Sequence, residues 1–217
     1  MAGARQSRRR TQEERTAETT ARLKQATLDI LLDRGYARAS TLDIADRAGV
    51  SRCALTHHFE SKDDLVCQAV EQLLREATAE IRDYAERVQS GRLDISGFID
   101  HLWEMFSGRL FYITLEHVTE ARHNDFLRAR LVPVVREFHQ ALDQIWSDFF
   151  RGAGLKSAEV ETALNASLCL LRGMGVQTVL RNDPAYYKRL LDFWKGIVSG
   201  LAANGKVVKL PARQLRG

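Results

Sequence analysis

The sequence predicts an all-α protein, and three observations support this fold class. Apolar residues recur at the three-and-four spacing of amphipathic helices through most of the chain. Prolines occur only at positions 133, 184 and 211, and the strict alternation of apolar and polar residues that strands require is lacking. Serine, threonine and glycine stand where helices would begin and end. We therefore expect about nine helices, in an N-terminal three-helix unit followed by a helical bundle.

Capping residues and glycines define the three N-terminal helices. The first is predicted at residues 16–34, with Gly35 placed to cap its C-terminus. The second covers residues 40–48 and starts with the capping-box sequence Ser-Thr-Leu-Asp. Gly49 then allows a left-handed turn, because glycine adopts a positive φ at little cost in conformational energy. A third helix is predicted at residues 51–58, because its first serine is a favourable N-cap.

The rest of the chain is predicted to form a connecting helix and a bundle. The connecting helix covers residues 62–89, with apolar residues at helical spacing down one face. Further helices are predicted at residues 95–106, 109–123, 125–151, 157–181 and 185–202. Pro133 either kinks its helix or marks the first turn, and Ser157 and Asp183 are placed to cap the last two helices.

Composition narrows the class of protein. The chain has 217 residues, of which 45% are hydrophobic and 28% are charged, as expected for a soluble globular protein. It lacks an apolar run of the ~18 residues that a membrane span needs, and its N-terminus lacks the apolar segment of a secretory signal. Cys53, Cys67 and Cys169 show no CxxC spacing. This favours a cytoplasmic protein without disulfides and without membrane association.

Motifs typical of enzymes and metal sites are missing from the sequence. There is no HExxH, no GxSxG and no glycine-rich phosphate loop. The six histidines also lack the spacing of a metal site. We therefore expect no catalytic residues, no metal and no cofactor.

Positive charge is concentrated near the N-terminus. Residues 1–62 contain 12 Lys or Arg against 8 Asp or Glu, whereas residues 63–217 contain 20 of each. A polyanion is the natural partner of such a segment, although a solvated basic tail would have the same composition.

Two short helices joined by a glycine turn predict a helix-turn-helix. The residues expected to seal it against the first helix are Ile44, Ala45, Ala48, Val50, Leu55 and Phe59. Those expected to face outward on its second helix are Arg52, Cys53, Ala54, Thr56 and His57. An outward face that no core covers is explained if the helix enters a DNA major groove, which is wide enough to admit it.

These residues resemble the DNA-binding domain of TetR-family transcriptional regulators. The resemblance is carried by Gly35-Tyr36, Ser40-Thr41, Ile44-Ala45, Ala48-Gly49-Val50-Ser51, Leu55, His58-Phe59 and Ser61-Lys62. It covers roughly residues 20–66, and the remainder fits by length and helical pattern alone. The chain departs from many relatives at Cys53 and Thr56, where they have glycine and tyrosine, so the DNA sequence it prefers stays open.

The resemblance implies a homodimer with an N-terminal reading head and a C-terminal domain that binds a small molecule and releases DNA. The predicted segments are a disordered basic arm at 1–15, the helix-turn-helix domain at 16–61, a connector with ligand-binding and dimerisation domain at 62–204, and a basic tail at 205–217. The arm from Arg5 to Arg10 would either enter a minor groove or be disordered in the free protein.

Eight residues are predicted to contact DNA by this resemblance. They are Thr41, Ser51, Arg52, Cys53, Ala54, Thr56, His57 and Lys62. The first two lie at helix N-termini, where phosphate binds, and the last two are expected to bind phosphate through their side chains. Cys53 and Ala54 would pack on thymine methyls, and Thr56 would bond a phosphate or touch such a methyl. Arg52 is the candidate for a guanine contact, with a phosphate contact as the alternative.

The central region contains bulky apolar residues with a few polar ones, as a small-molecule site requires. The candidate ligand-binding residues are Trp103, Met105, Phe106, Phe111, Tyr112, Glu116 and His117. Ordinary core packing is the alternative. Adjacent residues on a helix point about 100° apart, so only one of Glu116 and His117 is expected to face inward.

The last two predicted helices are candidates for the dimer interface. One stripe comprises Leu164, Leu168, Leu171 and Gly175, and the other extends from Tyr187 to Leu201. Two such helices from each subunit would form a four-helix bundle, unless these stripes pack within one chain. A dimer would place two recognition helices about 34–36 Å apart on a palindromic operator in double-stranded DNA.

The leading hypothesis is therefore a transcriptional repressor released from its operator by a small-molecule effector. Two alternatives remain at this point. One is a regulator that answers to a protein partner or acts as an activator, and the other is a helical enzyme or binding module that carries a helix-turn-helix.

Overall fold

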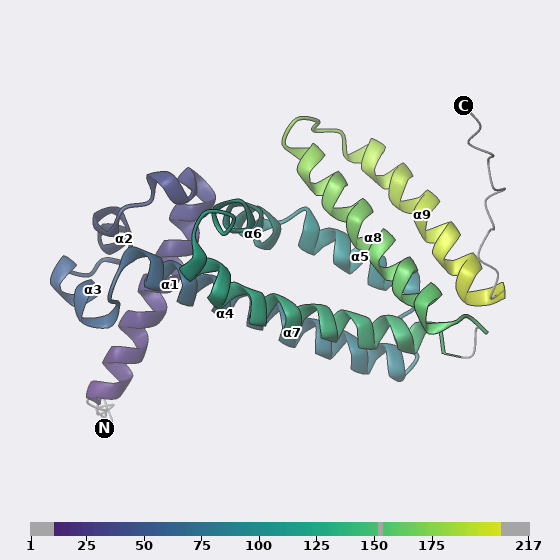
Figure 1. Ribbon diagram of the computed structural model, residues 1–217, viewed down its shortest axis with the longest axis horizontal. Coiled ribbons are helices and arrows are strands. Elements are labelled where there is room, and N and C mark those ends of the chain that lie inside the picture. The colour runs from purple at the N-terminus through teal and green to yellow at the C-terminus, as the bar shows by residue number, and fades with distance from the viewer. Residues whose placement is uncertain (1–10, 152–153, 205–217) are drawn as a thin grey trace, which may run out of the picture. The chain divides into compact units, whose positions relative to one another are not determined.

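The computed structural model describes residues 11–151 and 154–204, and these residues form nine α-helices and no strands (Figure 1). The helices are α1 (Gln12–Arg38), α2 (Thr41–Ala48), α3 (Arg52–His58), α4 (Lys62–Gln89), α5 (Ile95–Phe106), α6 (Arg109–Glu120), α7 (Asp125–Phe149), α8 (Ser157–Thr178) and α9 (Pro184–Asn204). The prediction of an all-α chain with about nine helices is confirmed.

Helix α1 begins four residues earlier than expected, because Thr11 and Glu14 form a capping box. The Glu14 N–H donates to Thr11 Oγ1 at 3.1 Å, and the Thr11 N–H donates to Glu14 Oε2 at 2.8 Å. Residues 12–15, which we expected to be disordered, are therefore helical. The arm Arg5–Arg10 and the tail 205–217 lie outside the described residues.

The ends of α1 and α8 also differ from the predictions, and the position of Pro133 decides between the two alternatives given for it. Gly35 has φ 72° and interrupts α1 without ending it, since the chain makes one more turn as far as Arg38. Pro133 lies inside α7 and not in its first turn. Helix α8 includes Ser157 as its first residue, and the N-cap is Lys156. The predicted cap of α9 is present, because Asp183 Oδ1 accepts the Tyr186 N–H at 2.9 Å.

The described chain forms two compact units. Unit 1 contains residues 11–73 and 112–133, and unit 2 contains residues 74–111 and 134–204. Helices α4, α6 and α7 contribute residues to both units.

The core of unit 1 joins the three N-terminal helices to the first part of α4. Its fully buried apolar side chains include Leu23, Ile30, Leu31, Ile44, Leu55, Leu65, Val66 and Ile113. The predicted seal of the helix-turn-helix is thus largely present, with Leu55 1% exposed and Phe59 3% exposed. Val50 is the exception and is only half-buried.

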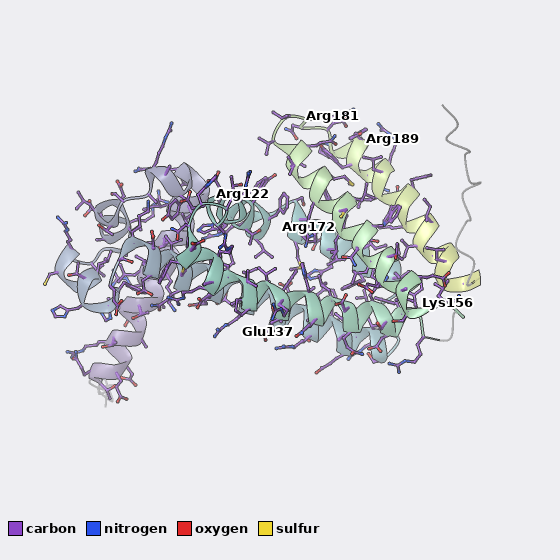
Figure 2. The ribbon with its side chains drawn as sticks, in the orientation of Figure 1. Arg122, Glu137, Lys156, Arg172, Arg181 and Arg189 are labelled. Atoms are coloured by element: carbon purple, nitrogen blue, oxygen red, sulfur yellow. The ribbon has the colours of Figure 1, made fainter. Side chains whose placement is uncertain are left out.

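The core of unit 2 is built around aromatic side chains from α5 and α7. Trp146 is fully buried, and its ring centroid lies 6.3 Å from that of Phe98. Helices α8 and α9 lie side by side, and Trp194 of α9 donates from Nε1 to Ser167 Oγ of α8 at 2.9 Å (Figure 1). On the surface, Arg82 of α4 pairs with Glu137 of α7 at 2.9 Å (Figure 2).

Candidate nucleic-acid interface and effector region

The turn between α2 and α3 depends on a glycine and an arginine. Gly49 adopts φ 63° and ψ 40°, the left-handed conformation that costs glycine least. Its N–H bonds the Asp46 carbonyl at 3.1 Å, which ends α2. Arg22 of α1 donates to the carbonyl of Ala48 and, at 3.0 Å, to that of Gly49. The Arg22 side chain thereby fixes the turn that sets the direction of α3.

Two ion pairs on the surface also hold α2 against α1. Arg47 contacts Asp33 at 2.6 Å, and Arg34 contacts Asp43 at 3.0 Å. All four side chains are more than a third exposed, so each pair contributes little to stability. Their main effect is to fix the orientation of α2.

Helix α3 exposes most of its polar residues to solvent. Ser51 caps it by accepting the Ala54 N–H at 3.1 Å, and Leu55 anchors its inner side. The exposed residues are Ser51, Arg52, Cys53, Thr56 and His57. Thr41 and Ala54, also predicted to contact DNA, are half-buried. The structure thus brings seven of the eight predicted residues to α3, its N-cap and the start of α2.

The remaining predicted residue, Lys62, is held by the protein itself. Its ammonium donates to the Tyr36 carbonyl at 2.8 Å and lies 4.1 Å from the centroid of the Tyr36 ring. This contact joins the start of α4 to the end of α1. A phosphate contact from Lys62 stays a prediction, and it would have to use the donors left after this bond.

Tyr36 is also the centre of a polar network that the sequence did not reveal. Its hydroxyl donates to Asp63, which also accepts from Asn124 Nδ2 at 3.2 Å. Burial, together with the bond and charge of Asp63, raises the pKa of Tyr36. The phenol therefore stays protonated and keeps its role as a donor. The network connects α1, the first turn of α4 and the residue before α7.

A second polar group in unit 1 joins α4 to α7. Arg130 donates from Nη1 to Asp64 and from Nε to Glu71, both at 2.9 Å. Burial alone would raise the pKa of Asp64, but the hydrogen bonds from Gln68 and Arg130 hold it below its ordinary value. Arg130 is 66 residues from Asp64 and 59 from Glu71 along the chain, so the sequence pattern alone did not indicate these pairs.

The predicted ligand residues of unit 1 have different environments. Tyr112 is half-buried, Glu116 is exposed, and His117 is 1% exposed. Only one residue of the adjacent pair Glu116 and His117 faces inward, as expected, and that residue is His117. Its Nδ1 lies 2.6 Å from the Ile113 carbonyl, and its ring meets that of Tyr36 edge-on at 6.1 Å. Burial lowers the pKa of His117, so this imidazole is neutral at pH 7.

The predicted ligand residues of unit 2 belong to its interior. Met105, Phe106 and Phe111 are each no more than 8% exposed, and the rings of the two phenylalanines meet edge-on at 5.8 Å. Gly175 packs against them: a Cβ at this position would lie 2.1 Å from the Phe106 carbonyl oxygen. Burial of this kind fits core packing and also fits the wall of an effector site.

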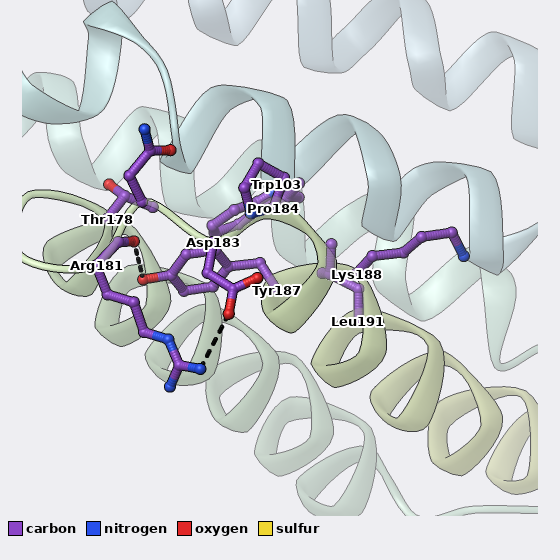
Figure 3. Close-up of a pocket in the computed structure, with 9 residues that line it drawn as sticks. Trp103, Thr178, Arg181, Asp183, Pro184, Tyr187, Lys188 and Leu191 are labelled. Atoms are coloured by element: carbon purple, nitrogen blue, oxygen red, sulfur yellow. Dashed lines mark hydrogen bonds and ion pairs between the residues drawn. The ribbon is translucent and has the colours of Figure 1, made fainter.

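Trp103, the last candidate of this set, lines a pocket of about 380 Å³ in unit 2 (Figure 3). The other lining residues are Thr178, Arg181, Asn182, Asp183, Pro184, Tyr187, Lys188 and Leu191. The Trp103 and Tyr187 rings stack at 5.5 Å. This pocket was not predicted from the sequence, because most of its wall comes from the loop between α8 and α9 and from the start of α9.

The predicted dimer stripes lie mainly inside the single chain. Leu164, Leu168 and Leu171 are at most 2% exposed, and Tyr187 is 4% exposed. Exposed apolar residues lie on the outward sides of α8 and α9 and in the turn after α8, and one of them, Ile197, belongs to the second predicted stripe. These residues are Val176, Val179, Leu180, Phe193 and Ile197, from 37% to 90% exposed. Both helices are apolar on two sides, and the pattern alone did not show which side faces the core.

Two kinds of feature are absent from the described residues. None of the described helices combines the length and the apolar character needed to cross a membrane. Within residues 11–151 and 154–204, no three or more His, Cys, Asp or Glu side chains are grouped so that they could hold a metal ion.

Comparison with known proteins agrees with this geometry. The profile of bacterial regulatory proteins of the tetR family matches residues 24–69, which contain α2, α3 and the turn between them. The HTH-type transcriptional regulator CymR of Pseudomonas putida is 29% identical over 182 residues, covering 84% of this chain and 90% of CymR.

Solved structures share the fold over nearly their whole length. A TetR-family transcriptional regulator from Mesorhizobium loti has a TM-score of 0.70 at 15% identity, covering 86% of this chain and 98% of that one. The regulator FadR of Bacillus subtilis, solved with stearoyl-CoA, has a TM-score of 0.62 at 17% identity, covering 86% and 99%. These structures show that the fold is shared; the matching profile, together with the similarity to CymR, identifies the chain as a helix-turn-helix transcriptional regulator that belongs to the TetR family.

Proposed function

We propose that this regulator is a homodimeric repressor that binds a palindromic operator through α3 and is released by a small-molecule effector. The observation that carries the proposal is the face of α3, which is exposed although its helix is capped and firmly anchored. A short helix held in this way and left uncovered is suited to a DNA major groove.

Arg52 is the residue of this face best suited to read a base. It is exposed at the first position of α3, and it forms no ion pair with any described residue. Its guanidinium can donate two parallel hydrogen bonds to a guanine. Ser51 and Thr41 lie at the N-termini of α3 and α2, where backbone amides favour phosphate. Cys53, Ala54, Thr56 and His57 complete the proposed contact surface.

The outward face of α8 and α9 is the proposed dimer interface. Phe193 and Ile197 lie one turn apart on α9, Val176 lies in the last turn of α8, and Leu180 follows in the turn after that helix. An apolar surface of this kind on a folded chain marks an interaction site. Gly173 of α8 and Gly196 of α9 have no atom near the position of an added Cβ, so a partner helix can approach closely there.

The effector is proposed to bind in residues 62–204, where the interior of unit 2 and the pocket at Trp103 supply apolar walls. FadR of B. subtilis, which shares this fold, has been solved in complex with stearoyl-CoA. Helix α4 is the proposed link, since it starts at Lys62 beside the end of α1 and continues into residues of unit 2. An effector that prefers the dimer with misplaced α3 helices would shift the population away from DNA.

Selection of bound sequences from a random DNA library tests the proposal. We expect enrichment of a palindrome whose half-sites are centred about 34–36 Å apart, one helical turn. Enrichment of single, unpaired half-sites would contradict a symmetric dimer. Linkage supplies the test of release: an effector that binds the protein equally well with and without operator cannot act in this way.

The dimer interface can be tested separately by measuring mass in solution. Phe193→Glu places a charge on the outward face of α9 and should yield monomers. Val132→Glu is the matched control, because Val132 is 47% exposed on α7 and lies outside the proposed interface. A Phe193→Glu protein that stays dimeric would refute this interface.

A further inference from the structure

One cation in the interior of unit 2 lacks the partner that its position calls for. Arg172 of α8 points toward α5 and α7, and Figure 2 labels it. Its Nη2 lies 2.9 Å from Nε2 of His139 on α7, and its guanidinium carbon lies 5.4 Å from the Phe106 ring centroid on α5. Both neighbours are uncharged side chains, because burial and the nearby Arg172 lower the pKa of His139.

No carboxylate oxygen of the described residues lies within 4.0 Å of the Arg172 guanidinium. Arg130, the comparable half-buried arginine of unit 1, has two such partners, Asp64 and Glu71. Burial lowers the pKa of Arg172, which shows that its charge is partly desolvated. The acid nearest to its neighbour His139 is Asp143, one turn along α7, whose own side chain is exposed. A half-buried guanidinium without a counter-ion is unfavourable unless an anion from outside joins it.

The side of α8 that carries Arg172 explains why this residue does not serve the dimer interface. It lies four residues after buried Leu168 and three before buried Gly175, so it shares their inward face. The close packing of Gly175 on the Phe106 backbone brings α5 next to α8. Phe106 is held in that position as an apolar surface beside the guanidinium.

The pocket at Trp103 offers no comparable charge. Its two cations are already paired within α9 and the loop before it, Arg181 with Asp183 at 3.0 Å and Lys188 with Asp192 at 2.6 Å. The two regions therefore differ in the chemistry that they can recognise.

We propose that Arg172 is the anion-binding residue of the effector site and that the effector is an organic carboxylate with an apolar body. The planar guanidinium can bind a carboxylate through two parallel hydrogen bonds. The apolar body would lie against Phe106, and His139 would hold the guanidinium in place. This inference rests on the proposed function, because it names the ligand class of the effector that releases DNA.

Thermal unfolding of the full-length protein with matched ligands tests the proposal. The probes are 4-phenylbutyrate and the straight-chain carboxylates from hexanoate to dodecanoate, each compared with its primary amide. The best carboxylate should raise the wild-type Tm by about 4 °C or more at saturation, because it binds only the folded protein. Its amide, which has the same apolar body without the charge, should shift the Tm by less than about 1 °C.

Substitutions identify the residue responsible. Arg172→Met keeps the length of the side chain without its charge, and the variant should lose the carboxylate shift. Its ligand-free Tm should equal or exceed that of the wild type, since an unpaired cation has been removed. Arg82→Met is the matched control, because Arg82 belongs to the exposed pair with Glu137 in the same unit. This control should keep the full carboxylate shift.

Three results would overturn the inference: a carboxylate shift that survives in Arg172→Met, amides that stabilise as well as carboxylates, or no shift from any carboxylate probe. A parallel measurement of DNA release keeps the two proposals apart. Carboxylates that bind through Arg172 without releasing operator would leave the anion site intact and refute effector control. Release by an uncharged compound that binds Arg172→Met equally well would preserve effector control and refute the anion site.

Discussion

The turn of the helix-turn-helix provides a prediction whose size follows from the structure. Gly49→Ala would place a side chain on a residue with φ 63°, which costs an alanine about 1–2 kcal/mol. The new Cβ would also lie 2.8 Å from Arg22 Nη2. Arg22 is flexible at this end, so it would move and weaken its bonds to the carbonyls of Ala48 and Gly49. With about 1–2 kcal/mol for those charge-assisted bonds, the total loss of stability is about 2–4 kcal/mol.

Gly91→Ala is the matched control for this substitution. Gly91 has φ 67°, but no atom lies within 4 Å of an added Cβ. Its replacement should therefore cost only the conformational part, about 1–2 kcal/mol. In an Arg22→Ala background, Gly49→Ala should cost no more than Gly91→Ala does, because the bonds that it weakens are already absent.

Urea unfolding at one protein concentration measures these differences, since the stability of a dimer depends on concentration. Operator affinity should fall with Gly49→Ala and stay unchanged with Gly91→Ala. If both variants lost the same stability in the wild-type background, the Arg22 bonds would contribute nothing and the reasoning about the turn would be refuted.

Three further predictions concern single side chains. Arg52→Ala should cost about 1–3 kcal/mol of operator affinity and relax one base position if Arg52 reads a guanine, whereas equal losses on every DNA sequence would make it a phosphate contact. Iodoacetamide should modify Cys53, which is exposed, and leave Cys67, whose pKa burial raises to about 11; operator DNA should protect Cys53, and mass spectrometry of peptides that showed no protection would contradict a DNA-facing α3. Arg130→Met should destabilise the protein by about 1–3 kcal/mol at neutral pH, because it leaves Asp64 and Glu71 without their shared cation. Since the pKa of Asp64 is lowered in the folded state, this contribution is present above the ordinary carboxyl pKa and should vanish as the pH falls below about 4; unfolding curves that kept the same difference at acid pH would refute it.

Helix boundaries in the N-terminal third were predictable because their signals are local. Ser40, Gly49 and Ser51 act on amides and carbonyls within a few residues, and the structure contains each of these caps. The start of α1 at Gln12 is set by an equally local signal, the Thr11–Glu14 capping box, although the basic run before it is typical of a disordered arm.

Contacts between distant residues could not be predicted in the same way. The family resemblance predicts Lys62 as a phosphate ligand, but Tyr36 of α1 supplies a carbonyl and a ring that hold its ammonium. The environment of Arg172 could not be predicted from its own helix, since it is set by Phe106 and His139 on two other helices. Periodicity defines the faces of a helix, but only the tertiary structure shows which neighbour each face meets.

Helices α8 and α9 illustrate the same limit for the dimer. Leu168 and Leu180 are both apolar residues at helical spacing, yet the first is 2% exposed and the second 90% exposed. The stripe of Leu164, Leu168 and Leu171, which was predicted to form the dimer interface, is the one that a single chain buries.

Fluorescence anisotropy with the DNA that flanks this protein's own gene tests the central claim most directly. The protein would be titrated at two salt concentrations against an excess of unrelated competitor DNA. Sequence-specific reading through α3 predicts tight binding that survives the competitor and weakens only gradually with salt. Binding that competitor and salt abolish together, with no preference for any tested sequence, would contradict the claim, because only the basic N-terminal third would then be acting on DNA.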